Sequence, residues 1–298
     1  MLYFVVTLIF FSSIEVVSKD LMRFLGPFEM TFFRFAIGAA GLAFYSLAKG
    51  SYKELSKLRA PDYSLFALLG FINIFFSMSV LQYAIKYGSP AVVALIFSSN
   101  PIFVYAFLIL LKKEKVSLKK ISGFTIGITG LTLVLLDDIG NFELEKGAIF
   151  ALAGSISFAI FTILNRKAVT EHRPIVVNMV SFAFGLGFIA VYLSWTGQIN
   201  INAELFGSNI RILKLLYLGI FVTAVGYITF LTAIKKMGPV ASSLIFLFKP
   251  ALATLFAVVF ISEQIGPNFF AGLLLSSVGS YMVIRKNKNR VIKCVQSA

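Results

Sequence analysis

The chain has 298 residues, of which 58% are hydrophobic and 13% are charged, and its mean hydropathy is +0.90. A water-soluble domain carries about a quarter charged residues, and the 33 phenylalanines of this chain are too many for one soluble core. Composition therefore excludes a soluble enzyme. It predicts an all-α membrane protein whose solvent is the lipid bilayer.

The net charge of +14 would suggest nucleic-acid binding in a soluble protein. Here the basic residues form short clusters between long apolar runs, a pattern typical of cytoplasmic loops that face anionic lipid. We therefore predict membrane lipid as a partner and no nucleic acid. The single cysteine, Cys294, and the single histidine, His172, exclude an internal disulfide and a Cys- or His-rich metal site. We predict no metal and no cofactor.

Ten apolar runs are long enough to cross the hydrocarbon core as helices, which requires about 20 residues each. The runs cover residues 2–22, 28–48, 63–85, 89–111, 118–136, 147–168, 174–195, 211–233, 239–261 and 267–284. If they alternate in direction, most Lys and Arg residues fall on one side, in 49–62, 112–120, 166–173, 235–236 and the tail. The positive-inside rule then predicts an inner-membrane protein with both termini in the cytoplasm.

The two halves of the chain resemble each other at nearly constant offsets. At an offset of 149 residues, Ala84-Ile85-Lys86 matches Ala233-Ile234-Lys235 and Pro101 matches Pro250, and at an offset of 147, Pro27 and Gly38 match Pro174 and Gly185. Each repeat holds five spans, and an odd number forces the halves into opposite orientations. We therefore predict two inverted five-helix repeats at 1–136 and 147–284, an outer linker loop at 137–146, and a basic cytoplasmic tail at 285–298.

Inverted repeats give a membrane protein two related conformations, each open to one face, which is the basis of alternating access. The sequence contains no Gly-rich nucleotide loop and no catalytic Ser/His pairing. We therefore predict a secondary transporter without catalytic residues. Duplication in a channel or in an intramembrane enzyme is the alternative, and an enzyme would need a catalytic pair at matched depth.

A longer pattern occurs once in each half. Asn100-Pro101 is followed by an apolar run to Lys113-Glu114 and a Gly-rich run from Gly123 to Leu136. Lys249-Pro250 is followed in the same way by Ser262-Glu263 and the run from Gly272 to Ile284. With this pattern the chain resembles the drug/metabolite transporter superfamily, specifically its ten-helix proteins with two EamA domains.

Arg34 is similar to an arginine that the family carries early in its second helix, whereas Phe10-Phe11-Ser12-Ser13 stands where the first helix often has a tryptophan. The resemblance implies that the first four spans of each repeat surround the transport path and that the fifth lies at the periphery. It also implies export, since family members export amino acids, drugs, nucleotide-linked metabolites and lipids.

Ionisable groups at bilayer depth are costly and are usually paired, cavity-lining or functional. Lys249 lies close to the membrane midplane and has no acid at i±3 or i±4. It is predicted either to hold an anionic group, such as a substrate carboxylate, or to form an ion pair between the halves. We expect an exporter of small metabolites such as amino acids, with a lipid or lipid-linked-sugar flippase as the alternative.

Three further ionisable residues lie within predicted spans. Glu15 and Lys19 have the i, i+4 spacing of a helical ion pair, and the alternative is that they bind substrate or an ion in the transport pathway. Glu15 is alternatively predicted to pair with Lys249, and would then be the candidate proton-coupling carboxylate. Arg34 is predicted either to snorkel or pair at a gate, or to take part in binding.

Neutral polar residues within the spans give a weaker signal, because each either lines a cavity or bonds within the helix bundle. The candidates are Asn73, Ser77, Asn100, Ser155, Ser157, Thr223 and Tyr227. Asp137-Asp138 is predicted to lie in a solvated outer loop. Gly123-x-x-x-Gly127 and Gly185-x-Gly187 predict close helix packing, with a homodimer as the alternative.

Overall fold

The computed structural model of the protein describes residues 2–113, 118–136, 142–197, 203–243 and 245–284, and within these ranges every regular element is helical. Eight helical runs in the described ranges are long and apolar enough to cross a membrane. They are Leu2–Leu21, Pro27–Lys49, Ala60–Tyr87, Pro90–Leu110, Glu145–Glu171, Pro174–Thr196, Asn209–Met237 and Pro239–Ile261. The prediction of an all-α membrane protein is therefore confirmed for the described residues.

The helices of the first half are α1 (Leu2–Ser12), α2 (Ile14–Leu21), α3 (Pro27–Lys49), α4 (Ala60–Gly70), α5 (Ser79–Tyr87), α6 (Pro90–Phe97), α7 (Asn100–Leu110) and α8 (Leu118–Leu136). Those of the second half are α9 (Phe142–Glu171), α10 (Pro174–Thr196), α11 (Asn209–Tyr217), α12 (Gly226–Met237), α13 (Pro239–Ser242), α14 (Ile245–Ile261) and α15 (Pro267–Ile284). Two 3₁₀ turns, η1 (Ser51–Lys57) and η3 (Ala203–Gly207), and two π-helical segments, η2 (Phe71–Met78) and η4 (Leu218–Val225), complete the described elements.

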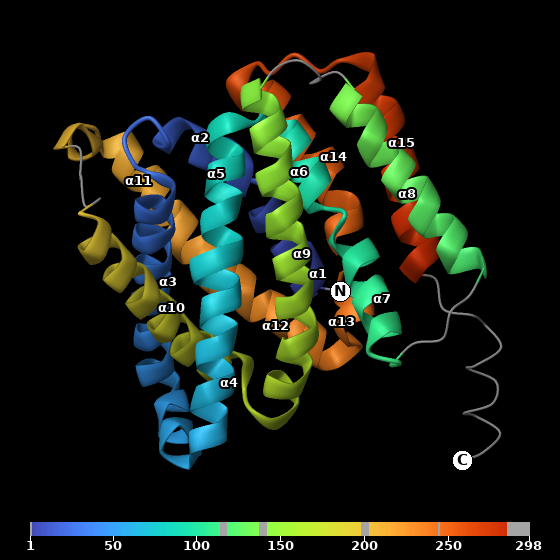
Figure 1. The fold of residues 1–298 in the computed structure, drawn as a ribbon. Helices are drawn as coiled ribbons and strands as arrows, with labels where there is room; N and C mark the ends of the chain where they lie inside the picture. The colour runs from blue at the N-terminus through green and yellow to red at the C-terminus, as the bar shows by residue number, and fades with distance from the viewer. Residues whose placement is uncertain (1, 114–117, 137–141, 198–202, 244, 285–298) are drawn as a thin grey trace, which may run out of the picture.

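Predicted spans 118–136 and 267–284 correspond to α8 and α15, which pack against each other at the edge of the molecule (Figure 1). Their backbones touch at glycines: a Cβ added to Gly279 would lie 2.4 Å from the Gly127 nitrogen, and one added to Gly130 would lie 2.6 Å from the Ser276 nitrogen. Gly127, one glycine of the predicted packing motif, therefore serves contact within the chain. Whether α8 and α15 complete a set of ten spans stays a prediction, because the apolar part of α8 is only Lys120–Val134.

Three spans are interrupted, and each interruption lies at a pair of serines: Ser12-Ser13, Ser98-Ser99 and Ser242-Ser243. In each pair, at least one serine hydroxyl donates to a carbonyl three or four residues back and so competes with the helical backbone bonds. The bonds run from Ser12 to Leu8 (2.7 Å), Ser13 to Phe10 (2.9 Å), Ser99 to Ile96 (2.7 Å), Ser242 to Pro239 (3.0 Å) and Ser243 to Val240 (2.7 Å). These breaks were not anticipated from the sequence.

Two further spans contain the π-helical segments. Each segment is eight residues long, and η4 begins 147 residues after η2, at the same offset as the first part of the sequence repeat. A hydroxyl bonds to a carbonyl five residues back at each segment, from Ser79, the residue after η2, to Ile74 (3.2 Å), and from Thr223 within η4 to Leu218 (2.8 Å). Because π-bulges occur frequently at functional sites, these segments direct attention to the side chains that they hold.

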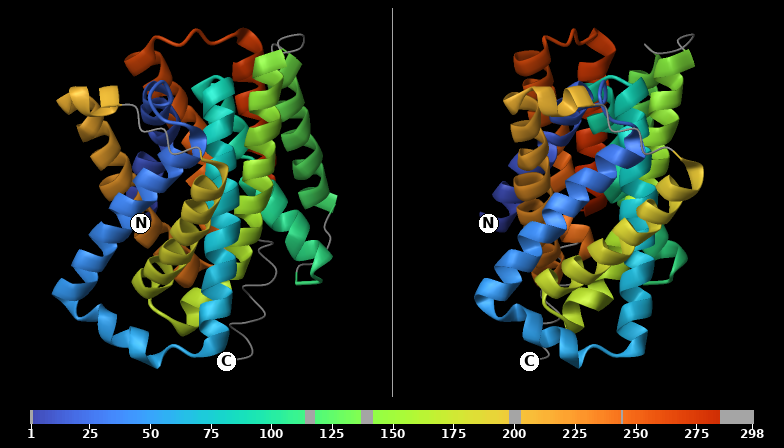
Figure 2. Two further views of the ribbon diagram at one scale, coloured as in Figure 1. Left: turned by 60° about the vertical axis from the view of Figure 1, so that its left-hand side comes forward. Right: turned by 90° about the vertical axis from the view of Figure 1, so that its left-hand side faces the viewer.

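The helices α3 and α10 hold equivalent places in the two halves. They run in opposite directions between the two ends of the molecule (Figures 1 and 2). Each is followed by a left-handed glycine, Gly50 (φ 68°) and Gly197 (φ 64°), again 147 residues apart. Gly38 of α3 contacts Thr223 of η4, and Gly185 of α10 contacts Ile74 of η2. Each helix thus packs on the π-helical segment of the other half.

Aromatic side chains fill the centre of the bundle. Phe158, Phe230 and Phe246 form one group, with ring centroids 5.5–5.9 Å apart. Tyr227 belongs to a second group that includes Phe35, whose ring centroid lies 5.6 Å from that of Tyr227. All five side chains are almost completely buried. This core accounts for part of the high phenylalanine content and encloses the buried polar residues described next.

Candidate functional site

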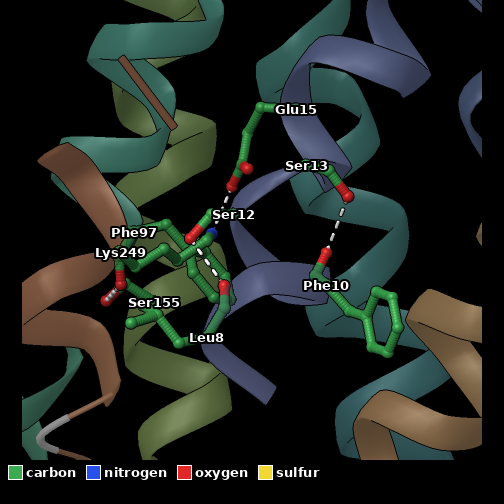
Figure 3. Close-up of polar contacts among 8 residues, drawn as sticks. All are labelled: Leu8, Phe10, Ser12, Ser13, Glu15, Phe97, Ser155 and Lys249. Carbon is green, nitrogen blue, oxygen red and sulfur yellow. Dashed lines mark hydrogen bonds and ion pairs between the residues drawn. The ribbon is translucent and has the colours of Figure 1, made fainter. Parts of the chain in front are cut away.

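A buried ion pair joins the beginning of the chain to its last third. Lys249 of α14 donates a hydrogen bond from Nζ to Oε1 of Glu15 in α2, and the two side chains point toward each other in Figure 3. Their exposed fractions are 1% and 0%. The Lys249 ammonium also lies 4.9 Å from the centroid of the Phe97 ring, a favourable cation–π distance. Of the two partners predicted for Glu15, the structure selects Lys249.

Lys19 makes different contacts from those its spacing to Glu15 suggests. Its ammonium donates to three backbone carbonyls at the C-terminal end of α5, those of Ile85 (2.8 Å), Lys86 (3.0 Å) and Gly88 (2.8 Å). These carbonyls have no intrahelical donor and carry the negative end of the helix dipole, so a cation stabilises them. Of the alternatives for these residues, the local Glu15–Lys19 pair is not the one observed, because Lys19 caps a neighbouring helix and Glu15 pairs with Lys249.

Arg166 repeats this arrangement in the second half. Its Nη1 donates to the carbonyls of Ile234 (2.8 Å) and Lys235 (2.7 Å), at the C-terminal end of α12. Arg166 follows Lys19 by 147 residues, and Ile234 and Lys235 follow Ile85 and Lys86 by 149. The same cation-to-carbonyl contact thus occurs once in each half, although the sequence analysis placed Arg166 only in a basic cluster.

Arg34 of α3 is buried as completely as the ion pair, with an exposed fraction of 0%. It does not snorkel to the surface. None of its three guanidinium nitrogens has a hydrogen-bond partner among the described residues. Its charge lies 4.8 Å from the centroid of the adjacent Phe35 ring and interacts electrostatically with Tyr227 and Glu15.

Asn73 and Tyr227 meet between the two halves. The Tyr227 hydroxyl donates to Oδ1 of Asn73 at 3.2 Å, and both side chains are buried. Asn73 belongs to η2, and Tyr227 lies in the first turn of α12, two residues after η4 ends, so the π-helical segments position both residues. Ser77 and Thr223, which lie one turn from these residues in the sequence, make other hydrogen bonds. Ser77 donates to the carbonyl of Gly154 (2.9 Å), and Thr223 bonds within η4.

Of the remaining neutral candidates, Asn100 and Ser155 join α6 and α7 to α9, and Ser157 bonds within α9. Asn100 donates from Nδ2 to the carbonyl of Ser155 at 3.2 Å, and the Ser155 hydroxyl donates to the carbonyl of Phe97 at 3.0 Å. Ser157 bonds to the carbonyl of Ala153 within its own helix at 2.7 Å. These contacts are those of polar residues that hold helices together in a membrane.

One end of the molecule carries a carboxylate that the sequence analysis did not select as a site residue. Glu263 follows α14 and accepts hydrogen bonds from the Ser89 hydroxyl and from the Ala91 backbone N–H (3.3 Å), at the N-terminal end of α6. Partial burial raises the pKa of Glu263, whereas these hydrogen bonds and the charge of Lys19 act in the opposite direction. Its place in the repeated Ser262-Glu263 pattern was the available sequence signal.

The opposite end has its own contacts between the halves. Nε2 of His172 lies 3.1 Å from Asp62, and Nε of Arg173 lies 2.6 Å from Glu54. Asp62, His172 and the exposed Glu171 bring ligand atoms within 4.8 Å of one another. The ring of His172 is already bonded to Asp62, so we assign these residues to contact between helices. Asp137, Asp138 and Cys294 lie outside the described residues.

The sequence profile of the EamA-like transporter family, whose two copies cover most of the chain, matches residues 1–136 and 145–285. The chain belongs to this family. An uncharacterized transporter of Clostridium kluyveri is 31% identical over 299 residues, which cover 96% of this chain and 93% of the relative. An uncharacterized transporter of Archaeoglobus fulgidus is 25% identical over 94% of this chain and 96% of the relative.

A solved crystal structure shares the fold of this EamA-family protein, with a TM-score of 0.70, 19% identity and coverage of 95% of both chains. A chloroplastic WAT1-related protein of Arabidopsis thaliana is 25% identical over 92% of this chain and 66% of the relative. Family membership, the transporter relatives and the apolar helices together identify an integral membrane protein that transports small molecules. They point to a transporter and not to an enzyme.

Proposed function

We propose that this protein is an alternating-access exporter of small metabolites such as amino acids, built from ten spans in two inverted repeats. The proposal places it in the inner membrane with both termini in the cytoplasm. The observation that carries it is the buried polar cluster of Glu15, Arg34, Asn73, Tyr227 and Lys249, to which both halves contribute. Buried ionisable groups of this kind mark substrate and ion pathways in membrane proteins.

The equivalent contacts in the two halves support the inverted repeat. Lys19 and Arg166 cap the last carbonyls of α5 and α12, and α3 and α10 each pack on the π-helical segment of the other half. A pseudo-twofold relation between two inverted repeats predicts such exchanged pairs. The caps lie within each half, whereas the packing of α3 and α10 joins each half to the other in an equivalent manner, as two repeats that rock against each other require.

Contacts between the halves at both ends support alternating access. Glu263 of the second half bonds Ser89 of the first at one end, and His172 bonds Asp62 at the other. An exporter of this kind would open one set while keeping the other closed. Glu15, paired with Lys249 in the cluster, is our candidate for the carboxylate that exchanges a proton during the cycle.

Two cross-linked variants test this mechanism. In a Cys294→Ser background, Ser89→Cys with Glu263→Cys clamps one end, and Asp62→Cys with His172→Cys clamps the other, each through a short bifunctional thiol reagent. We expect each clamp to stop net flux in reconstituted vesicles and a reductant to restore it when the linker is cleavable. Each single-cysteine variant treated with the same reagent is the matched control. Full flux with both ends clamped would exclude alternating access.

Metabolite profiling tests the direction and the substrate class. Cells that overproduce the protein should lose an exported compound from the cytoplasm and accumulate it in the medium, whereas cells that produce Lys249→Met should not. Depletion of the same compound from the medium would show import and would contradict the proposal. Purified protein in vesicles should then move the identified compound without ATP.

A further inference from the structure

Three ionisable side chains buried in the bundle carry a net charge of +1. Glu15, Arg34 and Lys249 have exposed fractions of 0%, 0% and 1%. Glu15 and Lys249 neutralise each other through their ion pair. Arg34 is then left as one uncompensated positive charge, which a protein interior tolerates only when a partner completes it.

The partner of Arg34 is missing from the surrounding helices. The elements with which α3 packs most extensively, α10, η4 and α5, contain no Asp or Glu. A guanidinium has five N–H donors in a planar fork, and Nε, Nη1 and Nη2 of Arg34 all lack an acceptor in the described part of the chain. The repeat supplies none either, because the counterpart of Arg34, 147 residues later, is the neutral Ser181.

The position of Arg34 suits a transport site and not the surface of the bundle. It lies against Phe35 and within electrostatic range of Tyr227 and Glu15, so it shares its surroundings with the cluster that joins the two halves. Lys249, which the sequence favoured as the anion-binding residue, is already engaged by Glu15. The charge that remains available to an anion is therefore that of Arg34.

We propose that Arg34 binds the carboxylate of the transported metabolite through its guanidinium fork; this proposal rests on the function proposed above and names its ligand chemistry. A carboxylate matches the guanidinium in two parallel hydrogen bonds, a geometry that a lysine does not provide. The carboxylate group supplies the negative charge that Arg34 lacks among the described residues. The second oxygen of Glu15, which has no hydrogen-bond partner among the described residues, is free to accept from the ammonium of an amino acid.

Thermal unfolding of the purified protein with the smallest carboxylates tests the proposal. Acetate should raise the melting temperature of the wild-type protein by about 2–4 °C near saturation, relative to chloride at equal ionic strength. Glycine should do the same or more if the ammonium also binds, and glycinamide, which lacks the carboxylate, should not. A larger effect of glycine than of acetate indicates an amino acid, and equal effects indicate a carboxylate without the amine contact. Absence of any acetate or glycine effect on the wild type would overturn the proposal.

Variants of Arg34 separate binding from folding. Arg34→Met should keep or raise the melting temperature of the ligand-free protein, because the unpaired charge is removed, and should lose the response to acetate and glycine. Arg34→Lys retains the charge but not the fork, and its response should fall well below that of the wild type. Arg23→Met, at an exposed position, is the matched control and should respond as the wild type does. A full response in Arg34→Met, or a large loss of its ligand-free stability, contradicts the proposal.

The two proposals fail separately. A wild-type protein whose flux is stopped by the end clamps but whose melting temperature ignores acetate and glycine is a transporter without this anion site. A protein that responds to acetate through Arg34 yet keeps its flux with both ends clamped has the site but does not work by alternating access.

Discussion

The spans Pro90–Leu110 and Pro239–Ile261 occupy equivalent places in the sequence repeat, yet they carry different chemistry at the same position. Asn100 and Lys249, each followed by proline, lie 149 residues apart. Asn100 begins α7, directly after a helix break, and its amide bonds the Ser155 carbonyl. Lys249 lies inside α14, beyond the break at Ser243, and reaches Glu15.

The comparison extends to the other buried charges. The counterparts of Glu15 and Arg34 in the second half are Thr162 and Ser181, both neutral. The structural features that the halves share, including the π-helical segments and the capped helix ends, therefore define a common scaffold. The charges break its symmetry, because the counterparts of Glu15, Arg34 and Lys249 in the other half are all neutral.

The first prediction concerns the Glu15–Lys249 ion pair, which has no charged counterpart in the other half. Glu15→Gln leaves the buried cations Lys249 and Arg34 together, whereas Lys249→Met leaves Glu15 with Arg34 in electrostatic range. Each change should lower the free energy of unfolding by about 3–5 kcal/mol, with the larger loss in Glu15→Gln. The double variant should recover most of that stability but no transport, since neither charge remains unpaired. Equilibrium unfolding in detergent and flux measurements check both statements, and an additive double variant would contradict the pairing.

The second prediction concerns a second ion pair, introduced at the counterpart positions of Lys249 and Glu15. Asn100→Lys alone places an unpaired ammonium in a buried position and should cost roughly 3 kcal/mol of unfolding free energy. Adding Thr162→Glu, the counterpart of Glu15, should restore part of the loss if the halves share one geometry. The unfolding free energies of both single variants and the double variant measure the coupling. If Thr162→Glu gives no rescue, the two halves differ in backbone arrangement as well as in charge.

The sequence carried the information that depends on local pattern. Apolar runs predicted the eight described spans, and the offsets of 147 and 149 predicted the repeated positions. Lys249 without an acid on its own helix predicted a distant partner. The contacts of the Lys19 and Arg34 side chains could not be predicted, because they depend on how neighbouring helices are rotated about their axes. Lys19 and Arg34 both interrupt apolar runs, yet one caps three carbonyls and the other has no acceptor among the described residues.

The helix breaks illustrate an intermediate case. Each of the three Ser-Ser pairs was visible in the sequence, and hydroxyl bonding to preceding carbonyls is a known cause of bent helices. The same chemistry at Ser157 leaves α9 unbroken, however. A serine pair therefore marks where a break is possible, and packing decides whether it forms.

A third prediction concerns the contact between the π-helical regions. Tyr227→Phe removes the hydrogen bond to Asn73 and leaves a buried carbonyl oxygen without its donor. The expected loss is about 1–2 kcal/mol of unfolding free energy. Ser77→Ala, which removes a bond from the first half to the Gly154 carbonyl of the second, is a matched control for a lost neutral hydrogen bond between the halves. If Tyr227 also orients substrate near Arg34, only Tyr227→Phe should raise the KM for transport, with little change in stability relative to Ser77→Ala.

The smallest predicted effect lies at the end of the molecule where the halves meet through Glu263. Its counterpart in the first half, Glu114, lies outside the described residues, so Glu263 alone provides a structural prediction. Burial raises the pKa of Glu263 above its ordinary value of 4.5. Glu263→Gln retains an oxygen that accepts from Ser89 and Ala91 but cannot be ionised. The difference between wild type and variant therefore measures the effect of protonation separately from that of the hydrogen bonds.

The sign of the effect follows from proton binding. Between pH 4.5 and the raised pKa, folded Glu263 keeps a proton that the unfolded chain has lost, so the free energy of unfolding falls as the pH rises through this window. Above the raised pKa the fall levels off, because both states are ionised. The wild-type minus Glu263→Gln difference in unfolding free energy, measured at intervals from pH 4 to pH 8, should therefore decline and then become flat. A difference that rises with pH would mean that the Ser89 and Ala91 hydrogen bonds and the nearby charge of Lys19 outweigh burial, and that this end of the molecule holds a carboxylate stabilised in its ionised form.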